Sequence, residues 1–207
     1  MLQRVNKRIL LAVLVGFTAG VVWLVAVRFV TYQSDNVHYH ANFALYINGE
    51  QDEFDNFTFY EEVEACVGAE HSNPKNRVHM HNHENHIVHV HDGAATWGHF
   101  FANLGYGLTN EALKTDDGVF VNSNNERLAF ILNGEKLETI SNRVIGDHDT
   151  LLINYGSENN ETLEERFEAI AQDAEDYNHK HDPGGCSGDE ELNFWTRLQR
   201  AIGIGNY

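Results

Sequence analysis

The sequence is short of the residue types on which several common chemistries depend. It has only two cysteines, Cys66 and Cys186, and no C-x-x-C pair, so a thioredoxin-like redox function has no local signature. Met1 and Met80 are the only methionines, which leaves soft Cu(I) coordination poorly supplied. The chain contains no nucleophile elbow, HExxH motif, P-loop or Rossmann fingerprint. The sequence therefore offers no signature of the best-known catalytic families.

Basic residues are also scarce. The chain has 14 Lys and Arg residues against 31 Asp and Glu residues, and every acidic residue lies beyond residue 30. Such a negative region repels nucleic acid and anionic lipid surfaces, so we expect no nucleic-acid partner. The acidity suits solubility, and it would also raise the local concentration of cations.

One long apolar run lies near the N-terminus. Residues 9–27 contain no charged residue, and at about 1.5 Å per residue they just cross a hydrocarbon core of about 30 Å. Arg4, Lys7 and Arg8 precede the run and Arg28 follows it, so the positive-inside rule predicts a cytoplasmic N-terminus. A cleaved signal peptide is the alternative, but the end of the run has no good small-x-small cleavage site.

We therefore predict a single-pass protein of the cell membrane with the bulk of its chain outside the cytoplasm. Its successive parts would be a cytoplasmic N-terminus, a transmembrane signal anchor, a linker, a histidine-rich α+β domain and an amphipathic tail: residues 1–8, 9–27, 28–36, 37–188 and 189–207. Gly16 and Gly20 form a GxxxG pair through which two anchors can form a homodimer. In an oxidising compartment, Cys66 and Cys186 are expected to form a structural disulfide bond.

Alternating apolar and polar residues predict a β-sheet. Residues 37–47 alternate as a half-buried strand with histidines on its polar face, and residues 50–54 would return beside it. Asn48 and Gly49 between them suit a two-residue hairpin turn. Residues 127–140 repeat this strand and turn pattern, either by internal duplication or because amphipathic hairpins look alike.

Two helices are expected beside the sheet. Thr96 can cap a short helix that ends at Gly105, and residues 160–178 have the apolar spacing of one long helix. The short helix, the second Asn-Gly hairpin and a late strand resemble the β-grasp pattern of ubiquitin-like domains within residues 96–156. The predicted fold class is α+β: one mainly antiparallel sheet with a short and a long packed helix.

More than half of the 13 histidines lie in one short stretch. Because strand side chains alternate between faces, His79 and His81 would share one face, and His89 and His91 would share a face of the next segment. With residues 82–86 as the loop, antiparallel pairing sets His79 opposite His89. Four imidazoles would then gather on one side of a hairpin.

This pattern predicts a metal site, because imidazole is the commonest protein ligand for zinc and copper. We expect Zn²⁺ or Cu²⁺ as the bound ion. The expected primary ligands come from the hairpin and from the first strand: His79, His81, His89, His91, His38 and His40. Secondary candidates come from the hairpin loop and from a second H-x-H segment near the C-terminus: His83, His86, His179, His181 and Asp182.

The favoured function is binding, sequestration or delivery of metal at the cell envelope. A metal-dependent hydrolase or oxidoreductase is the second interpretation, in which Glu84 would be the acid or base. The third is a structural, adhesive or pH-responsive surface protein without metal. The segments VHVHDG…TWGHFF and YNHKHDPGGCSG make residues 37–188 resemble membrane-anchored, histidine-rich envelope proteins of bacteria, a resemblance that implies no particular activity.

Overall fold

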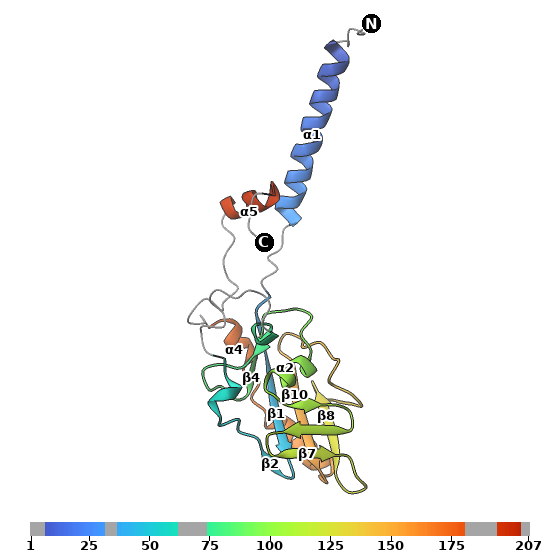
Figure 1. The fold of residues 1–207 in the computed structure, drawn as a ribbon, viewed down its shortest axis with the longest axis vertical. Coiled ribbons are helices and arrows are strands. Elements are labelled where there is room, and N and C mark those ends of the chain that lie inside the picture. The colour runs from blue at the N-terminus through green and yellow to red at the C-terminus, as the bar shows by residue number, and fades with distance from the viewer. Residues whose placement is uncertain (1–6, 32–36, 62–73, 181–193, 204–207) are drawn as a thin grey trace. The chain divides into compact units, whose positions relative to one another are not determined.

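The chain forms two compact units. The structure is a computed structural model that describes residues 7–31, 37–61, 74–180 and 194–203 (Figure 1). One unit combines residues 1–35 with residues 189–207, and the other comprises residues 36–188.

The first unit contains the predicted apolar helix. Helix α1 spans Lys7–Thr31, and it is long and apolar enough to cross a membrane. It includes all of the predicted span, residues 9–27. The same unit contains α5 (Phe194–Ala201), which forms inside the predicted C-terminal tail, and the rings of Phe194 and Phe29 lie 5.4 Å apart.

The second unit is built on a seven-stranded sheet with the order β3-β4-β1-β10-β8-β9, in which β2 also pairs with β1. The strands are β1 (Tyr39–Ile47), β2 (Glu50–Gln51), β3 (Val78–His79), β4 (Ile87–Val90), β8 (Arg127–Leu132), β9 (Glu135–Leu137) and β10 (Thr150–Gly156). The two central strands, β1 and β10, are parallel, and the other pairs are antiparallel. The predicted α+β class is confirmed, but the parallel pair makes the sheet mixed.

Both predicted Asn-Gly turns form hairpins. Asn48 and Gly49 join β1 to β2 with φ of 51° and 95°, and the later Asn-Gly pair joins β8 to β9. These left-handed conformations are what a two-residue hairpin turn requires. The first return strand is shorter than the predicted 50–54, because Phe54, at φ 51°, turns the chain inward and buries its ring.

One face of the sheet holds the main hydrophobic core. Helix α2 (Trp97–Asn103) begins at its predicted cap, Thr96, and the side chain of His99 completes a capping box. The ring of Phe100 from α2 lies 4.9 Å from that of Phe43 on β1, and both side chains are buried. Strands β5 (Gly107–Leu108), β6 (Ala112–Thr115) and β7 (Gly118–Val121) form a second, three-stranded antiparallel sheet, so the described residues contain two sheets where the sequence predicted one. The unit also contains the 3-10 turns η1 (Phe57–Phe59) and η3 (Pro74–Asn76).

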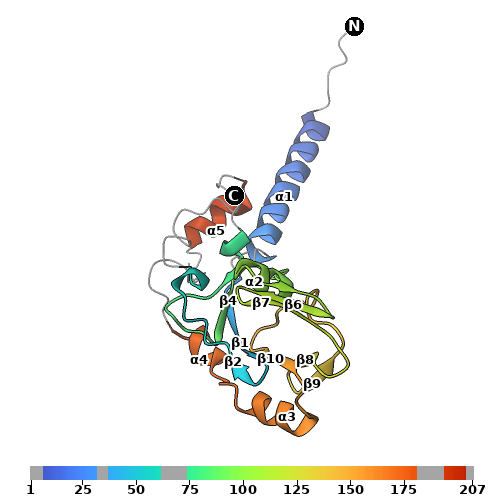
Figure 2. The same cartoon turned by 60° about the horizontal axis from the view of Figure 1, so that its bottom comes forward.

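Two short helices lie on the opposite face, where the sequence predicted a single long one. Helix α3 spans Asn160–Glu168 and α4 spans Ala174–Asn178, so the prediction of one helix over 160–178 is wrong (Figure 2). The side chain of Asn42 on β1 explains the break. It accepts the first backbone N–H of α4 at 3.0 Å and donates to Oδ1 of Asp173 at 2.7 Å. These bonds hold α4 against β1.

Candidate metal centre

A row of three histidines crosses three neighbouring strands. In the antiparallel ladders, His79 of β3 is paired with His89 of β4, and His89 is paired with His40 of β1. Because directly opposite residues on antiparallel strands point to the same face, the three imidazoles lie side by side. The predicted opposition of His79 and His89 is thus present, and β1 adds a third member to the row.

Three more histidines extend the row into a cluster of six. We call this set the histidine cluster: His38, His40, His79, His81, His89 and His91. The rings of His38 and His91 stack with centroids 4.8 Å apart and planes 5° apart. The ring centroids of His81 and His89 are 3.6 Å apart, and those of His79 and His91 are 5.1 Å apart. The histidines of the hairpin and of the first strand therefore belong to one group.

Four of the six histidines of the cluster are buried, and His38 and His91 are half-buried. His40 and His89 are 0% exposed, and His79 is 2% exposed. The prediction of a half-buried first strand is wrong, because β1 lies between β4 and β10 and its histidine side is covered by α4.

The tightest group in the cluster consists of His38, His40 and His89. One ligand atom of each lies within 4.8 Å of the other two. Nε2 of His40 and Nδ1 of His89 are only 2.8 Å apart. A tetrahedral zinc ion with bonds of about 2.0 Å holds its ligand nitrogens about 3.3 Å apart. Binding of an ion at these two atoms would therefore require the rings to rotate apart and the proton between Nε2 of His40 and Nδ1 of His89 to leave.

A chain of hydrogen bonds fixes the proton position on His40. Its Nδ1 lies 2.6 Å from Oδ1 of Asn178, and an amide oxygen only accepts, so Nδ1 carries the proton. The amide nitrogen of Asn178 lies 2.8 Å from Oδ1 of Asp147 and 2.8 Å from Nε2 of His148, which fixes the amide orientation. In neutral His40 the lone pair is therefore on Nε2, the atom that faces His89.

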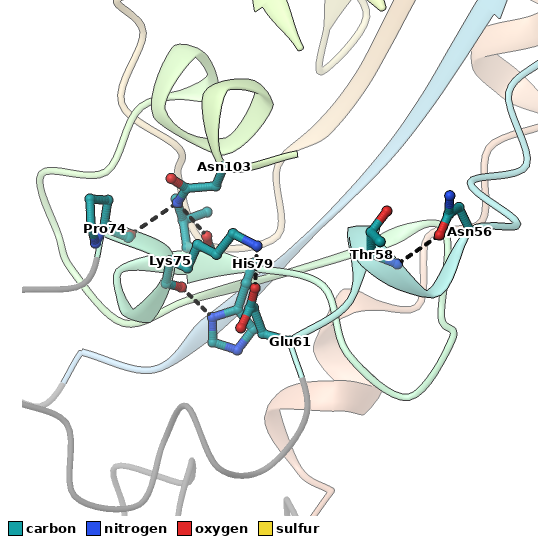
Figure 3. A network of polar contacts seen from close by, with 8 residues as sticks. Asn56, Thr58, Glu61, Pro74, Lys75, His79 and Asn103 are labelled. Atoms are coloured by element: carbon teal, nitrogen blue, oxygen red, sulfur yellow. Dashed lines mark hydrogen bonds and ion pairs between the residues drawn. The ribbon is translucent and has the colours of Figure 1, made fainter. Parts of the chain in front are cut away.

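His79 is oriented in the same manner on the other side of the cluster. Its Nδ1 donates to the carbonyl oxygen of Lys75 at 2.7 Å, which places the lone pair of the neutral ring on Nε2 (Figure 3). Asn103 of α2 holds this segment by donating to the carbonyls of Pro74 and Val78, each at 2.9 Å. Metal-binding histidines usually donate their other ring N–H to such an oxygen.

Glu84 lies next to the cluster through Tyr177 of α4. The ring of Tyr177 is 5.8 Å from that of His40, and its hydroxyl donates to Oε1 of Glu84 at 2.9 Å. Burial, together with the hydrogen bond to Glu84, raises the pKa of Tyr177 well above its ordinary value. The phenol stays protonated at neutral pH, so one oxygen of Glu84 is held in a structural hydrogen bond.

Three of the predicted secondary ligands have other surroundings. Nε2 of His86 lies 3.3 Å from Oδ2 of Asp173. Burial alone would raise the pKa of Asp173, but hydrogen bonds, including that from His86, lower it below its ordinary value. His83 is exposed and packs 4.8 Å from the ring of Tyr60. His179 is exposed at the C-terminal end of α4.

Four predicted residues lie outside the described part of the chain. His181 and Asp182 follow α4, and Cys66 and Cys186 fall in the two internal segments that the structure does not describe. The second H-x-H group and the disulfide bond therefore stay predictions.

Asn178 and Lys75 are the residues of the site that the sequence analysis missed. Asn178 immediately precedes the second H-x-H segment, which was the only signal near it, and the sequence indicated it merely as the end of a helix. Lys75 acts through its backbone carbonyl, which has no signature in a sequence. Both roles depend on the folded chain, since Asn178 lies 138 positions from His40.

No protein-family model, curated protein or solved structure matches this chain. The chemistry of the site therefore rests on its own geometry. Three features describe it: close imidazole nitrogens, burial, and oxygen acceptors that orient the rings at both ends of the histidine row.

Proposed function

We propose that the protein is a membrane-anchored, extracytoplasmic metal-binding protein that holds zinc or copper(II) in the histidine cluster. The observation that carries the proposal is the group of His38, His40 and His89, whose ligand atoms lie within 4.8 Å of one another. Three imidazoles are a common protein ligand set for zinc and also suit copper(II). The biological role would be sequestration or delivery of the ion.

The donor set supports zinc or copper(II) over other ions. Magnesium and calcium prefer oxygen ligands, whereas imidazole nitrogen suits zinc, copper and nickel. Met80 stands between two histidines of the cluster in the sequence, but its thioether is buried in the main core on the opposite face. A site built from imidazoles and lacking that thioether favours copper(II) over copper(I).

Orientation of the rings before binding supports the same proposal. The Nδ1 protons of His40 and His79 are held by the oxygens of Asn178 and Lys75, so both rings present Nε2. A ligand that is already in the correct tautomer loses less free energy when the ion binds. A merely polar surface would not require its imidazoles to be held in one tautomer.

Anchoring at the cell envelope is part of the proposal. Helix α1 has the length and composition of a membrane span, and the basic residues before it favour a cytoplasmic N-terminus. The acidic residues, all of which follow α1, would raise the concentration of cations around the site.

A β-grasp-like arrangement is proposed for the sheet of the second unit. Two Asn-Gly hairpins flank the central parallel pair of β1 and β10, and α2 packs on one face. Strands β3 and β4 extend this arrangement next to β1; they contain His79 and His89, and His81 and His91 follow directly after them.

Binding is preferred to catalysis because the predicted base is already engaged. A metal-dependent enzyme needs an open coordination position and an available acid or base. Glu84 accepts the hydroxyl proton of Tyr177 at 2.9 Å, and the raised pKa of that tyrosine keeps this bond at neutral pH. A carboxylate held in this way is better suited to supporting α4 than to moving protons.

The test is the metal content of the full-length chain, purified in detergent with a tag that contains no histidine. Mass spectrometry would compare the wild type with the His38→Ala/His40→Ala/His89→Ala variant and with His83→Ala, an exposed histidine of the same hairpin. We expect zinc or copper in the wild type and in His83→Ala, and its loss from the triple variant.

Two further observations make the test decisive. Far-UV circular dichroism shows whether the triple variant folds. If it does not fold, the single variant His40→Gln, which keeps a polar side chain of similar size, is used in its place. A folded wild type that contains no metal and takes up neither added zinc nor added copper would refute the proposal. The metal-free, pH-responsive interpretation would then be preferred.

A further inference from the structure

The histidine cluster offers more donors than one ion uses. Zinc in proteins takes four ligands, or three and a water, whereas the cluster contains six imidazoles in continuous ring contact. The tight group uses His38, His40 and His89. The other members are His79, His81 and His91.

The two oriented histidines are held by separate groups. His40 is on β1 and His79 is on β3, and β4 runs between these strands. Nδ1 of His40 is bonded to Asn178, and Nδ1 of His79 is bonded to the Lys75 carbonyl. The cluster therefore has an independently oriented ring on each side of β4.

The second group is more open than the first, which among the described residues is the group whose three ligand atoms lie within 4.8 Å of one another. His79 lies 5.1 Å from His91 and 5.8 Å from His81, measured between ring centroids. The Nε2 atoms of all three rings are buried. The Nδ1–H of His79 is bound to the Lys75 carbonyl, on a turn that Asn103 holds from α2 (Figure 3). This group thus has its own orienting oxygen, independent of Asn178.

We infer that the histidine cluster is a two-ion site, with a second zinc or copper(II) ion bound by His79, His81 and His91. The inference rests on the proposed function, because it adds an ion to the same cluster. The two ions are neighbours, since the ring centroid of His89 in the first group lies 3.6 Å from that of His81 in the second. Two dications repel each other, so the second ion binds more weakly than the first.

Titration of the full-length chain in detergent with zinc, followed by calorimetry, tests the stoichiometry. We expect two equivalents in two steps for the wild type and for His83→Ala. His79→Ala/His81→Ala should keep one tight equivalent, and His38→Ala/His40→Ala should keep one weaker equivalent. The corresponding His→Asn pairs replace any alanine variant whose circular dichroism shows that it has not folded.

Electron paramagnetic resonance of the chain loaded with two equivalents of copper(II) tests the proximity of the ions. Two neighbouring copper(II) ions give a dipolar-broadened spectrum with a half-field signal, whereas each pair variant should give the spectrum of an isolated ion. A wild-type spectrum of two isolated ions would overturn the shared cluster.

The stoichiometry separates this inference from the proposed function. One equivalent in the wild type that either pair variant abolishes would mean a single ion, which refutes the second site and leaves metal binding intact. No uptake of zinc or copper by the folded wild type would refute both.

Discussion

The Nδ1 atom of His40 lies 2.6 Å from Oδ1 of Asn178, which joins a central strand to the helix that covers it. Asn178 is the last residue of α4, and its amide nitrogen binds Asp147 in the loop before β10. Helix α4, the loop and the candidate ligand are therefore connected by one side chain. A substitution at Asn178 should therefore alter metal binding without removing a metal ligand.

Replacing Asn178 with alanine should weaken zinc binding by about 10- to 100-fold, because the Nδ1 proton of His40 loses its acceptor. Calorimetry measures the affinity, and nitrogen-15 NMR of the His40 ring reports the tautomer. Asn178→Asp, which keeps an acceptor oxygen, should recover the His40 tautomer but only part of the affinity, because it loses the donor to Asp147 and places two carboxylates side by side. Asn85→Ala, which removes an exposed hydrogen bond to Glu53, is the matched control. Unchanged affinity in folded Asn178→Ala would contradict the orienting role.

Gly98→Ala should destabilise the second unit by about 1–3 kcal/mol, because an added Cβ would lie 2.5 Å from the backbone oxygen of Ser141. The oxygen cannot move freely, since it also accepts the Gly98 N–H at 2.9 Å. Urea unfolding followed by circular dichroism measures the loss. Gly93→Ala is the control, with its nearest contact the Val37 side chain at 3.6 Å. Equal stabilities of the two variants would count against this packing.

Glu158→Gln should remove part of the pH dependence of stability. Burial alone would raise the pKa of Glu158, but a hydrogen bond from Asn154 and the charge of Arg166 lower it below its ordinary value. A carboxylate with a lowered folded pKa stabilises the protein above its unfolded pKa, and that contribution is lost as pH falls through the folded pKa.

The variant should therefore be about 1 kcal/mol less stable than the wild type at pH 7, and the difference should vanish at acid pH. Urea unfolding at a series of pH values between neutral and acid measures it. Glu164→Gln is the control, because its ion pair with Lys136 is exposed and worth little. A difference that grows as the pH falls would have the wrong sign for this account.

Removal of residues 1–30 should release the protein from membranes, because α1 is the described helix that is long and apolar enough to span one. Carbonate-washed membranes should retain the full-length chain and lose the truncated one. External protease should cleave the second unit in intact spheroplasts if the N-terminus is cytoplasmic. A full-length chain that stays in the soluble fraction would contradict the anchor.

Local patterns predicted the short-range features of this fold. The two Asn-Gly hairpins, the Thr96 cap of α2 and the pairing of His79 with His89 each depend on residues close together in the chain. Periodicity and turn chemistry act over such distances, so a sequence contains enough information to place them. The H-x-H spacing likewise identified all six members of the histidine cluster.

Only the tertiary structure decided how these pieces meet. The parallel pairing of β1 with β10 joins segments about a hundred residues apart, and it makes β1 a central strand whose histidine face is buried. The break between α3 and α4 comes from Asn42, on a strand far away in the sequence, and it outweighs helical periodicity. Asn178 reaches His40 for the same reason. The sequence by itself determined which residues are candidate ligands, and long-range packing determined which of them face one another, because that depends on contacts no local pattern encodes.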